Sequence, residues 1–311
     1  MLLIQYKLAS NVRIVPFANN WCASTLLGRQ RTRTGLPITV SWRTQCQPSG
    51  RGAVTIGTSA TAVIRQREMA PEERDARVQL AACYRIFDML GWIEMIFNHI
   101  TLRLPGPERH FLINPYGLWY REVTASNLVK IDTDANLVSE SDWPVNRAGF
   151  IIHSAIHAAR EDAHCIMHTH TTAGMAIACQ RNGLLPNNFY SAQIYHDVAY
   201  HDFEGVTTRD DEKPRLVRSL GQKNCLILRN HGLLTCGRTV PEAFLRMWKL
   251  QRACEIQHAA ESSGRPLVEL SAEVLERTPV IPPIAPGEPT DRRLFAALVR
   301  RIDALDQSYR S

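Results

Sequence analysis

Acidic residues are absent from the first 67 positions of this 311-residue chain. Nine of its 36 lysines and arginines lie in that stretch, and the first carboxylate is Glu68. The other 27 basic residues stand against 30 acidic ones, so the net charge of +6 belongs to the N-terminal segment. A nucleic-acid interface needs basic side chains clustered on one folded face. The charge distribution therefore predicts no nucleic-acid partner.

Long apolar runs and paired cysteines are also lacking. No stretch approaches the roughly 18 uncharged apolar residues of a transmembrane helix, which predicts no membrane partner. The eight cysteines include no C-x-x-C pair, and several stand inside apolar runs. Such cysteines are typical of buried free thiols in a reducing compartment. We therefore expect a cytoplasmic protein without disulfides.

Composition divides the chain into three parts. Residues 1–70 are rich in Arg, Ser, Thr and Gly and are predicted to form an extension with little fixed structure. Two interpretations of this extension stay open: an organellar targeting sequence, or translated upstream sequence that ends where Met69 opens a natural start. Residues 71–265 are the predicted domain. Residues 266–311 are predicted to be a proline-rich linker and a C-terminal amphipathic helix.

Helical and strand-like patterns alternate irregularly along the predicted domain. Apolar residues at helical spacing predict helices, and short apolar runs between turn residues predict strands. The helices are expected over 71–90, 149–160, 172–179, 241–261 and 291–305, and the strands over 100–104, 110–113, 128–131, 163–169, 225–228 and 233–236. This mixed order predicts an α/β fold with a central sheet covered by helices.

Two histidines stand two positions apart at the end of a predicted buried strand. Residues i and i+2 of a strand face the same side, so His168 and His170 can approach one ion. His231 is the candidate third ligand, because it sits at a turn before Gly232, whose small size lets the backbone crowd a site. Three imidazoles leave positions open for water or substrate, as in catalytic metal sites. The alternative is a pair of sheet-edge histidines that only form hydrogen bonds.

Several longer motifs occur between residues 75 and 262. They are Phe97–Arg103 (FNHITLR), His110–Gly117 (HFLINPYG), Glu122–Lys130 (EVTASNLVK), Ala148–Arg160 (AGFIIHSAIHAAR), His168–Thr171 (HTHT) and Leu226–Gly237 (LILRNHGLLTCG). Together they resemble the class II aldolase/adducin family. The resemblance implies a three-layer α/β/α sandwich on a mostly antiparallel sheet, often a homotetramer. It also implies a divalent metal on the three histidines, with zinc expected and manganese or iron as alternatives.

The chain departs from the sugar-phosphate aldolases of that family at positions that their chemistry uses. Those enzymes carry a catalytic glutamate nineteen residues before the first metal histidine, where this chain has Gly149. Their phosphate-binding segments correspond here to residues 97–99, 116–117 and 147–148, and only Gly117 is retained. We therefore expect a small-molecule substrate other than a typical sugar phosphate.

Other polar residues of these motifs receive provisional roles. The candidate acid–base residues are His99, because a histidine side chain ordinarily titrates near neutrality, and Tyr190, which stands near the place of a proton-donating tyrosine that aldolases supply across a subunit boundary. The candidate substrate-binding residues are Asn98, Asn114 and Gly117. The helical pair His153 and His157 is interpreted as packing and hydrogen-bonding residues, and Asp210–Glu212 as a solvated helix start.

Three functions stay open at this point. A metal-dependent lyase would break a C–C bond by retro-aldol cleavage or decarboxylation, both of which leave an enolate that a metal ion stabilises. An adducin-like module would bind a protein partner of the actin or cytoskeletal type without turnover. An iron-dependent oxygenase would consume O2 on the same scaffold. The complete set of three histidines favours the lyase.

Overall fold

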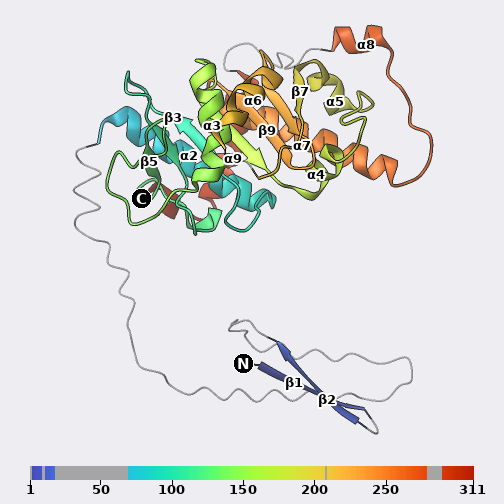
Figure 1. Ribbon diagram of the computed structural model, residues 1–311, viewed down its shortest axis with the longest axis horizontal. Helices are drawn as coiled ribbons and strands as arrows, with labels where there is room; N and C mark the ends of the chain where they lie inside the picture. Colours follow the sequence, from blue (N-terminus) through green and yellow to red (C-terminus); the bar gives the residue numbers. More distant parts are fainter. Residues whose placement is uncertain (1, 9–10, 18–68, 207–208, 279–288) are drawn as a thin grey trace. The chain divides into compact units, whose positions relative to one another are not determined.

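The computed structural model describes residues 2–8, 11–17, 69–206, 209–278 and 289–311 (Figure 1). The chain forms two units, Met1–Ile56 and Gly57–Ser311. In the first unit, β1 (Leu2–Leu8) and β2 (Asn11–Phe17) pair as antiparallel strands. Residues 1, 9–10 and 18–68 of the predicted N-terminal extension, and residues 279–288 of the predicted linker, lie outside the described residues.

A seven-stranded sheet forms the centre of the second unit, in the order β5-β4-β3-β6-β9-β8-β7. All neighbouring strands are antiparallel except β7 and β8, which are parallel. The strands are β3 (Ile100–Arg103), β4 (Phe111–Ile113), β5 (Val129–Ile131), β6 (Cys165–Thr169), β7 (Val198–His201), β8 (Cys225–Leu228) and β9 (Gly232–Gly237). The predicted strands are confirmed within one or two residues. Strand β7 was not predicted, because four residues are too few to show a clear alternation of apolar and polar side chains.

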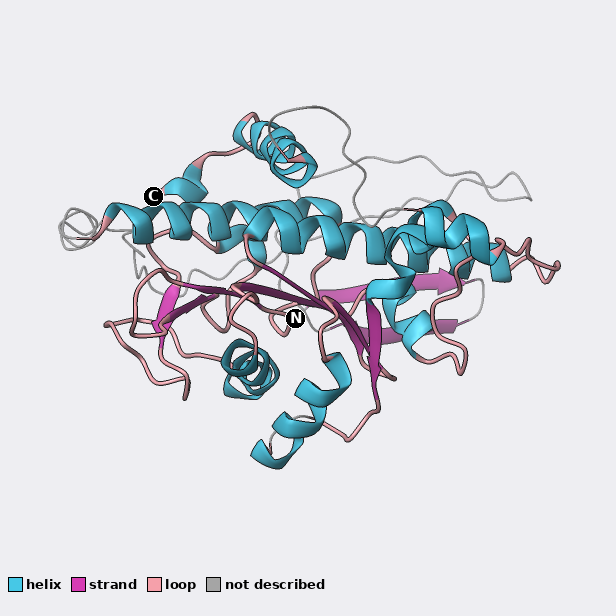
Figure 2. Ribbon diagram, turned by 90° about the horizontal axis from the view of Figure 1, so that it is seen from above, coloured by secondary structure: helices cyan, strands magenta, loops and turns pink. Residues whose placement is uncertain are grey.

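Helices lie on both sides of this sheet (Figure 2). The helices of the second unit are α2 (Pro71–Leu90), α3 (Arg147–Ala159), α4 (Thr172–Ala178), α5 (Phe189–Ile194), α6 (Lys213–Leu220), α7 (Val240–Glu261), α8 (Ala272–Arg277) and α9 (Thr290–Asp303). Single 3-10 turns occur at Tyr120–Glu122, Tyr195–Asp197, Asp210–Glu212 and Ser308–Arg310. None of the helices in the described ranges is long and apolar enough to cross a membrane.

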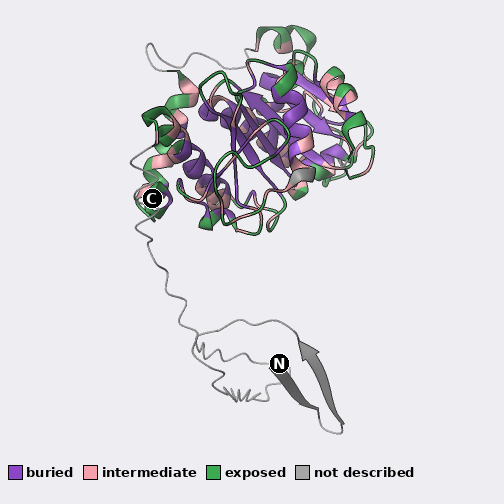
Figure 3. Cartoon of the chain, turned by 60° about the vertical axis from the view of Figure 1, so that its left-hand side comes forward, coloured by how far each residue is buried: buried purple, intermediate pink, exposed green. Residues whose placement is uncertain are grey.

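Strand β6 shows how one strand serves two cores. Cys165 and Met167 belong to the core that includes residues of α2, α7 and α9, whereas Ile166 belongs to the core with α3 and α6. This alternation follows from the two-residue period of a strand. Figure 3 shows the sheet buried between the two helix layers. The arrangement confirms the predicted α/β/α sandwich with a mostly antiparallel sheet.

Helix α2 begins and ends where the sequence predicts. Pro71 occupies the first turn, and the carboxylates of Glu72 and Glu73 lie at the positive end of the helix dipole. Gly91 ends the helix in the left-handed conformation, with φ of 72°. The buried face of the helix then supports β3 and, through it, the residues that precede that strand.

Candidate metal centre

The register between β6 and β9 brings the three histidines together. His168 lies opposite Leu234 and Thr169 opposite Leu233 in this antiparallel pair. The last residue of β6 therefore stands beside the first residues of β9. His170 directly follows β6 and His231 directly precedes β9, so imidazoles from two distant segments meet at one edge of the sheet.

The three rings face one another closely. One ligand nitrogen from each of His168, His170 and His231 lies within 4.8 Å of the others, and the ring centroids are 4.5, 4.8 and 4.9 Å apart. Nitrogens bound to one ion at about 2.1 Å are at most about 4.2 Å apart, so small side-chain rotations would bring all three to bonding distance. The third ring thus points to the place that the first two share.

A backbone carbonyl orients the buried histidine of the set. His168 Nδ1 lies 2.9 Å from the carbonyl oxygen of Leu233. A carbonyl can only accept, so Nδ1 carries the proton and Nε2 keeps a lone pair. That Nε2 lies 2.7 Å from Nε2 of His170. The carbonyl therefore holds His168 in the tautomer that a metal ligand needs.

Gly232 makes the close approach of the turn possible. A Cβ at this position would lie 2.4 Å from the carbonyl oxygen of Thr169 and 3.0 Å from Cδ2 of His170. The backbone of β6 could not move away without breaking its pairing with β9. A side chain at residue 232 would thus separate the turn that carries His231 from the other two rings.

The surroundings keep the three imidazoles neutral. Burial lowers the pKa of His168 well below its ordinary value, and electrostatic interaction with the neighbouring histidines lowers it further. Burial likewise lowers the pKa of His170 and brings that of His231 to about 4. Neutral imidazole is the form that binds metal ions. His168 is buried while His170 and His231 are half-buried, so the group is accessible from solvent on one side. Three such nitrogen donors fit a divalent cation.

Comparison with known proteins identifies the family. The family model described as "Class II Aldolase and Adducin N-terminal domain" matches residues 78–258. The chain belongs to the class II aldolase/adducin family. Members of this family usually bind a divalent metal, act on small molecules and are often oligomeric.

Two relatives and one solved structure show the range of this class II aldolase/adducin family. A Pseudomonas aeruginosa protein named "putative aldolase class 2 protein" is 47% identical over 210 residues, which cover 68% of this chain and 81% of that protein. Mouse alpha-adducin is 46% identical over 198 residues, which cover 62% of this chain but 27% of the adducin. The crystal structure of an aldolase II superfamily protein from Pseudomonas syringae has a TM-score of 0.75 and 43% identity, over 80% of this chain and 99% of that one.

A histidine ring fills the space beside Gly149. A Cβ at Gly149, on α3, would lie 2.5 Å from Cε1 and 2.7 Å from Nδ1 of His99. The His99 ring centroid lies 5.7 Å from that of His168. His99 is buried, and burial lowers its pKa to about 4. A side chain at residue 149 and the imidazole of His99 therefore exclude each other in this conformation.

The other sequence-predicted site residues have different surroundings. Asn98 is buried beside His99, and neither polar atom of its side chain has a hydrogen-bond partner within the described ranges. Asn114 is also buried, but its Oδ1 accepts a hydrogen bond from the Tyr84 hydroxyl at 3.0 Å. Gly117 lies in an exposed turn with φ of 108°. The Asn114 side chain is therefore engaged with the core, whereas the polar atoms of Asn98 are buried without a hydrogen-bond partner among the described residues.

Tyr190 lies on α5 and packs against an aromatic side chain. Its ring is perpendicular to that of Trp248 on α7, with centroids 5.1 Å apart. The Tyr190 side chain borders the core that includes α2, α7 and α9. Its role as a proton donor across a subunit boundary stays a prediction.

Glu212 corrects one prediction from the sequence. Asp210 and Asp211 are exposed, as expected of a solvated helix start, but Glu212 is only 6% exposed. Its Oε1 lies 3.3 Å from Nε2 of His201, and its charge raises the pKa of His231. The run of three acids gave no sign of this burial, which arises because α6 packs on β7. The structure thus adds a buried carboxylate within electrostatic reach of the candidate metal centre.

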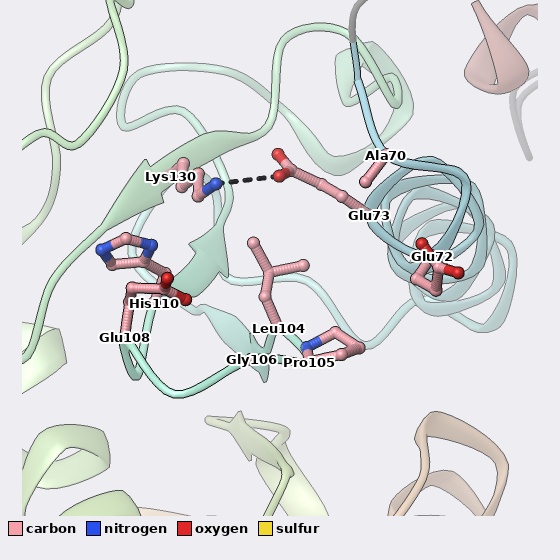
Figure 4. Close-up of a pocket in the computed structure, with 9 residues that line it drawn as sticks. All are labelled: Ala70, Glu72, Glu73, Leu104, Pro105, Gly106, Glu108, His110 and Lys130. Carbon is pink, nitrogen blue, oxygen red and sulfur yellow. Dashed lines mark hydrogen bonds and ion pairs between the residues drawn. The ribbon is translucent and has the colours of Figure 1, made fainter.

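A cavity of about 290 Å³ lies elsewhere in the second unit (Figure 4). Its lining residues are Ala70, Glu72, Glu73, Leu104, Pro105, Gly106, Glu108, His110 and Lys130. The ammonium of Lys130 pairs with Glu73 at 2.8 Å. The lining includes none of the three clustered histidines, so this cavity is separate from the candidate metal centre.

Proposed function

We propose that this protein is a divalent-metal-dependent lyase that breaks a C–C bond of a hydroxy- or keto-acid, by retro-aldol cleavage or decarboxylation. The observation that carries the proposal is the convergence of three neutral imidazoles, with His168 Nδ1 held by the Leu233 carbonyl. Zinc is the proposed ion, because a three-histidine set with an accessible side is a common catalytic zinc site.

Different residues of the chain would have different roles in such a reaction. His168, His170 and His231 would hold the ion. When bound, the ion would supply Lewis-acid stabilisation of the enolate, worth several kcal/mol. A stabilisation of about 1.4 kcal/mol corresponds to a tenfold increase in rate. Glu212 adds negative charge near His231. Retro-aldol cleavage also needs a base for the substrate hydroxyl proton, and His99, whose ring lies against Gly149, is the proposed candidate. Decarboxylation needs no such base.

The substrate differs from a typical sugar phosphate in this proposal. Gly149 has no side chain to act as a base, and the His99 ring fills the space beside it. The segment that the resemblance aligns with a phosphate-binding element of those aldolases contains Asn98, whose buried carboxamide has no hydrogen-bond partner among the described residues.

Metal analysis and a substrate screen test the proposal together. The full chain is purified without chelators, assayed for bound Zn, Mn and Fe, and tested for turnover of small hydroxy- and keto-acids. We expect about one metal ion per chain and metal-dependent turnover, both lost in His168→Ala and retained in the exposed control His164→Ala. Metal-free, inactive wild-type protein would contradict the lyase, and rapid cleavage of L-fuculose 1-phosphate would contradict its substrate class. O2 consumption during turnover would indicate an oxygenase.

The similarity to mouse alpha-adducin supports a second candidate function, a module that binds a protein partner. In that case His168→Ala would leave binding unchanged, because the histidines would serve no ligand. Comparison of partner binding between wild type and His168→Ala distinguishes the two functions.

A further inference from the structure

The turn that carries His231 is a short reversal of the chain between two strands. Strand β8 ends at Leu228 and β9 begins at Gly232, and the N–H of His231 donates to the carbonyl oxygen of Leu228 at 3.1 Å. Within this turn Asn230 has a φ of 56°, in the left-handed region that Gly and Asn adopt more readily than other residues. Asn230 is exposed, so its side chain contributes through the backbone conformation that it permits and not through packing.

Hydrogen bonds fasten this turn to the C-terminal end of helix α4. The N–H of Asn230 donates to the carbonyl oxygen of Ala178, the last residue of α4, at 3.1 Å. Nη1 of Arg229 donates to the carbonyl oxygens of Gln180 at 2.7 Å and Arg181 at 3.2 Å, just beyond the helix. The last carbonyls of a helix have no partner within the helix, and a cationic side chain is favourable near them. The turn thus supplies donors and a positive charge to the end of α4.

An aromatic ring holds the guanidinium of Arg229 in place. Arg229 Cζ lies 4.3 Å from the centroid of the Tyr200 ring, on β7, and a guanidinium over an aromatic face is attracted to it. The Tyr200 hydroxyl accepts a hydrogen bond from the N–H of Leu184 at 3.0 Å, so the ring is itself fastened to the loop that follows α4. The backbone N–H of Arg229 donates to the carbonyl oxygen of His201 at 2.8 Å. Arg229 is therefore fixed through both its backbone and its side chain.

The other end of α4 lies next to His170. Thr171 is the N-cap of the helix, and its hydroxyl accepts from the N–H of Gly174 at 3.3 Å and donates to Oε1 of Gln251, on α7, at 2.6 Å. One candidate ligand thus directly precedes the N-cap of α4, and the turn that carries His231 is bonded to the last residue of the same helix. Helix α4 therefore joins the two ligand segments, in addition to the pairing of β6 with β9.

We propose that Arg229 and Asn230 are positioning residues, which fasten the turn of His231 to the end of α4 and so hold the third imidazole in place for the divalent ion. The ion then meets rings that already face one another, and little of its binding free energy is needed to order the turn. Removal of groups that orient metal ligands typically weakens metal binding about 10- to 100-fold. This proposal rests on the proposed metal site but not on the proposed reaction.

The zinc affinity of the full chain, measured by competition with a chromophoric chelator, tests the role of Arg229. Arg229→Met removes the guanidinium and keeps a long side chain, and we expect it to weaken zinc binding at least about tenfold. Arg229→Lys, which keeps the charge and a donor, should recover part of this loss. Arg181→Met is the matched control, because Arg181 is exposed nearby and contributes its backbone carbonyl. Its zinc affinity should stay within about twofold of wild type.

Substitutions at residue 230 test the backbone conformation of the turn separately. Asn230→Gly keeps the freedom to adopt a φ of 56° and should retain wild-type zinc affinity. Asn230→Ala should weaken zinc binding about five- to tenfold, because the metal-free turn relaxes to relieve its strain and the ion must restore it. Asn182→Ala is the control, since Asn182 is an exposed asparagine of the neighbouring loop without a positive φ.

Amide hydrogen exchange gives a readout that needs no metal. In peptides that span residues 228–232, we expect the amides of Asn230 and His231 to be protected in the metal-free wild type and in Arg181→Met, and to exchange at least about tenfold faster in Arg229→Met. Unchanged exchange in Arg229→Met would overturn the proposal.

The outcomes separate this proposal from the proposed function. Wild-type zinc affinity in both Arg229→Met and Asn230→Ala, with only lower stability, would overturn the positioning role and leave the metal site intact. A wild-type protein that binds no zinc would refute the metal site and the positioning role together. Weaker zinc binding in the two variants of a protein without lyase turnover would sustain the positioning role and refute the proposed reaction.

Discussion

The exclusion between the His99 ring and a side chain at residue 149 can be measured as a coupling free energy. Gly149 lies in the first turn of α3, where alanine is favoured over glycine by about 0.5–1 kcal/mol. An alanine Cβ would however lie 2.5–3.1 Å from three atoms of the His99 ring. Forcing such a contact in a packed site costs about 1–3 kcal/mol. We therefore expect Gly149→Ala alone to lower the free energy of unfolding by roughly 0–2 kcal/mol, the balance of these terms.

Removal of the ring should reverse the sign of this effect. In a His99→Ala background the methyl group meets open space, so Gly149→Ala should stabilise the protein by about 0.5–1 kcal/mol. The double-mutant cycle then gives a coupling of about 1–3 kcal/mol. The four proteins are compared by urea unfolding at one protein concentration and without added metal, because both variables shift apparent stability. A coupling below about 0.5 kcal/mol would show that the ring moves aside freely, and the reasoning would fail.

Two further predictions concern how residues outside the three clustered histidines contribute to the stability of the protein. Between pH 6.5 and 3 the unfolded chain protonates His157 while the folded chain, with a pKa of about 3, does not. The free energy of unfolding should thus fall with decreasing pH. The variant His157→Asn should reduce the slope of this dependence by about 1.4 kcal/mol per pH unit, as measured by urea unfolding between pH 4 and 6. An unchanged slope would contradict the neutral buried ring. Tyr309 is fully buried, its hydroxyl donates to Asp303 at 2.6 Å and its carbonyl accepts from Ala125. Tyr309→Ala should cost about 3–5 kcal/mol and Tyr309→Phe about 1, and equal losses in thermal or urea unfolding would disprove the packing role.

Local patterns were sufficient to predict most elements and the pair His168 and His170. Pro71 and Gly91 mark the ends of α2 by their backbone preferences. The H-x-H spacing places two imidazoles on one side of a strand without reference to the rest of the fold. Such features depend on residues that are neighbours in the sequence, so a few positions are enough to predict them.

Contacts between distant segments were decided by the tertiary structure. The β6–β9 register sets the distance from His231 to His168, the packing of α6 on β7 buries Glu212, and the packing of α3 on β3 puts His99 against Gly149. Neither Glu212 nor Thr101 is distinguished by its neighbours in the sequence. The segments that fold against these two residues determine which contacts their side chains make. Burial and hydrogen-bond direction depend on residues that are distant in the sequence, so a local sequence pattern cannot predict them.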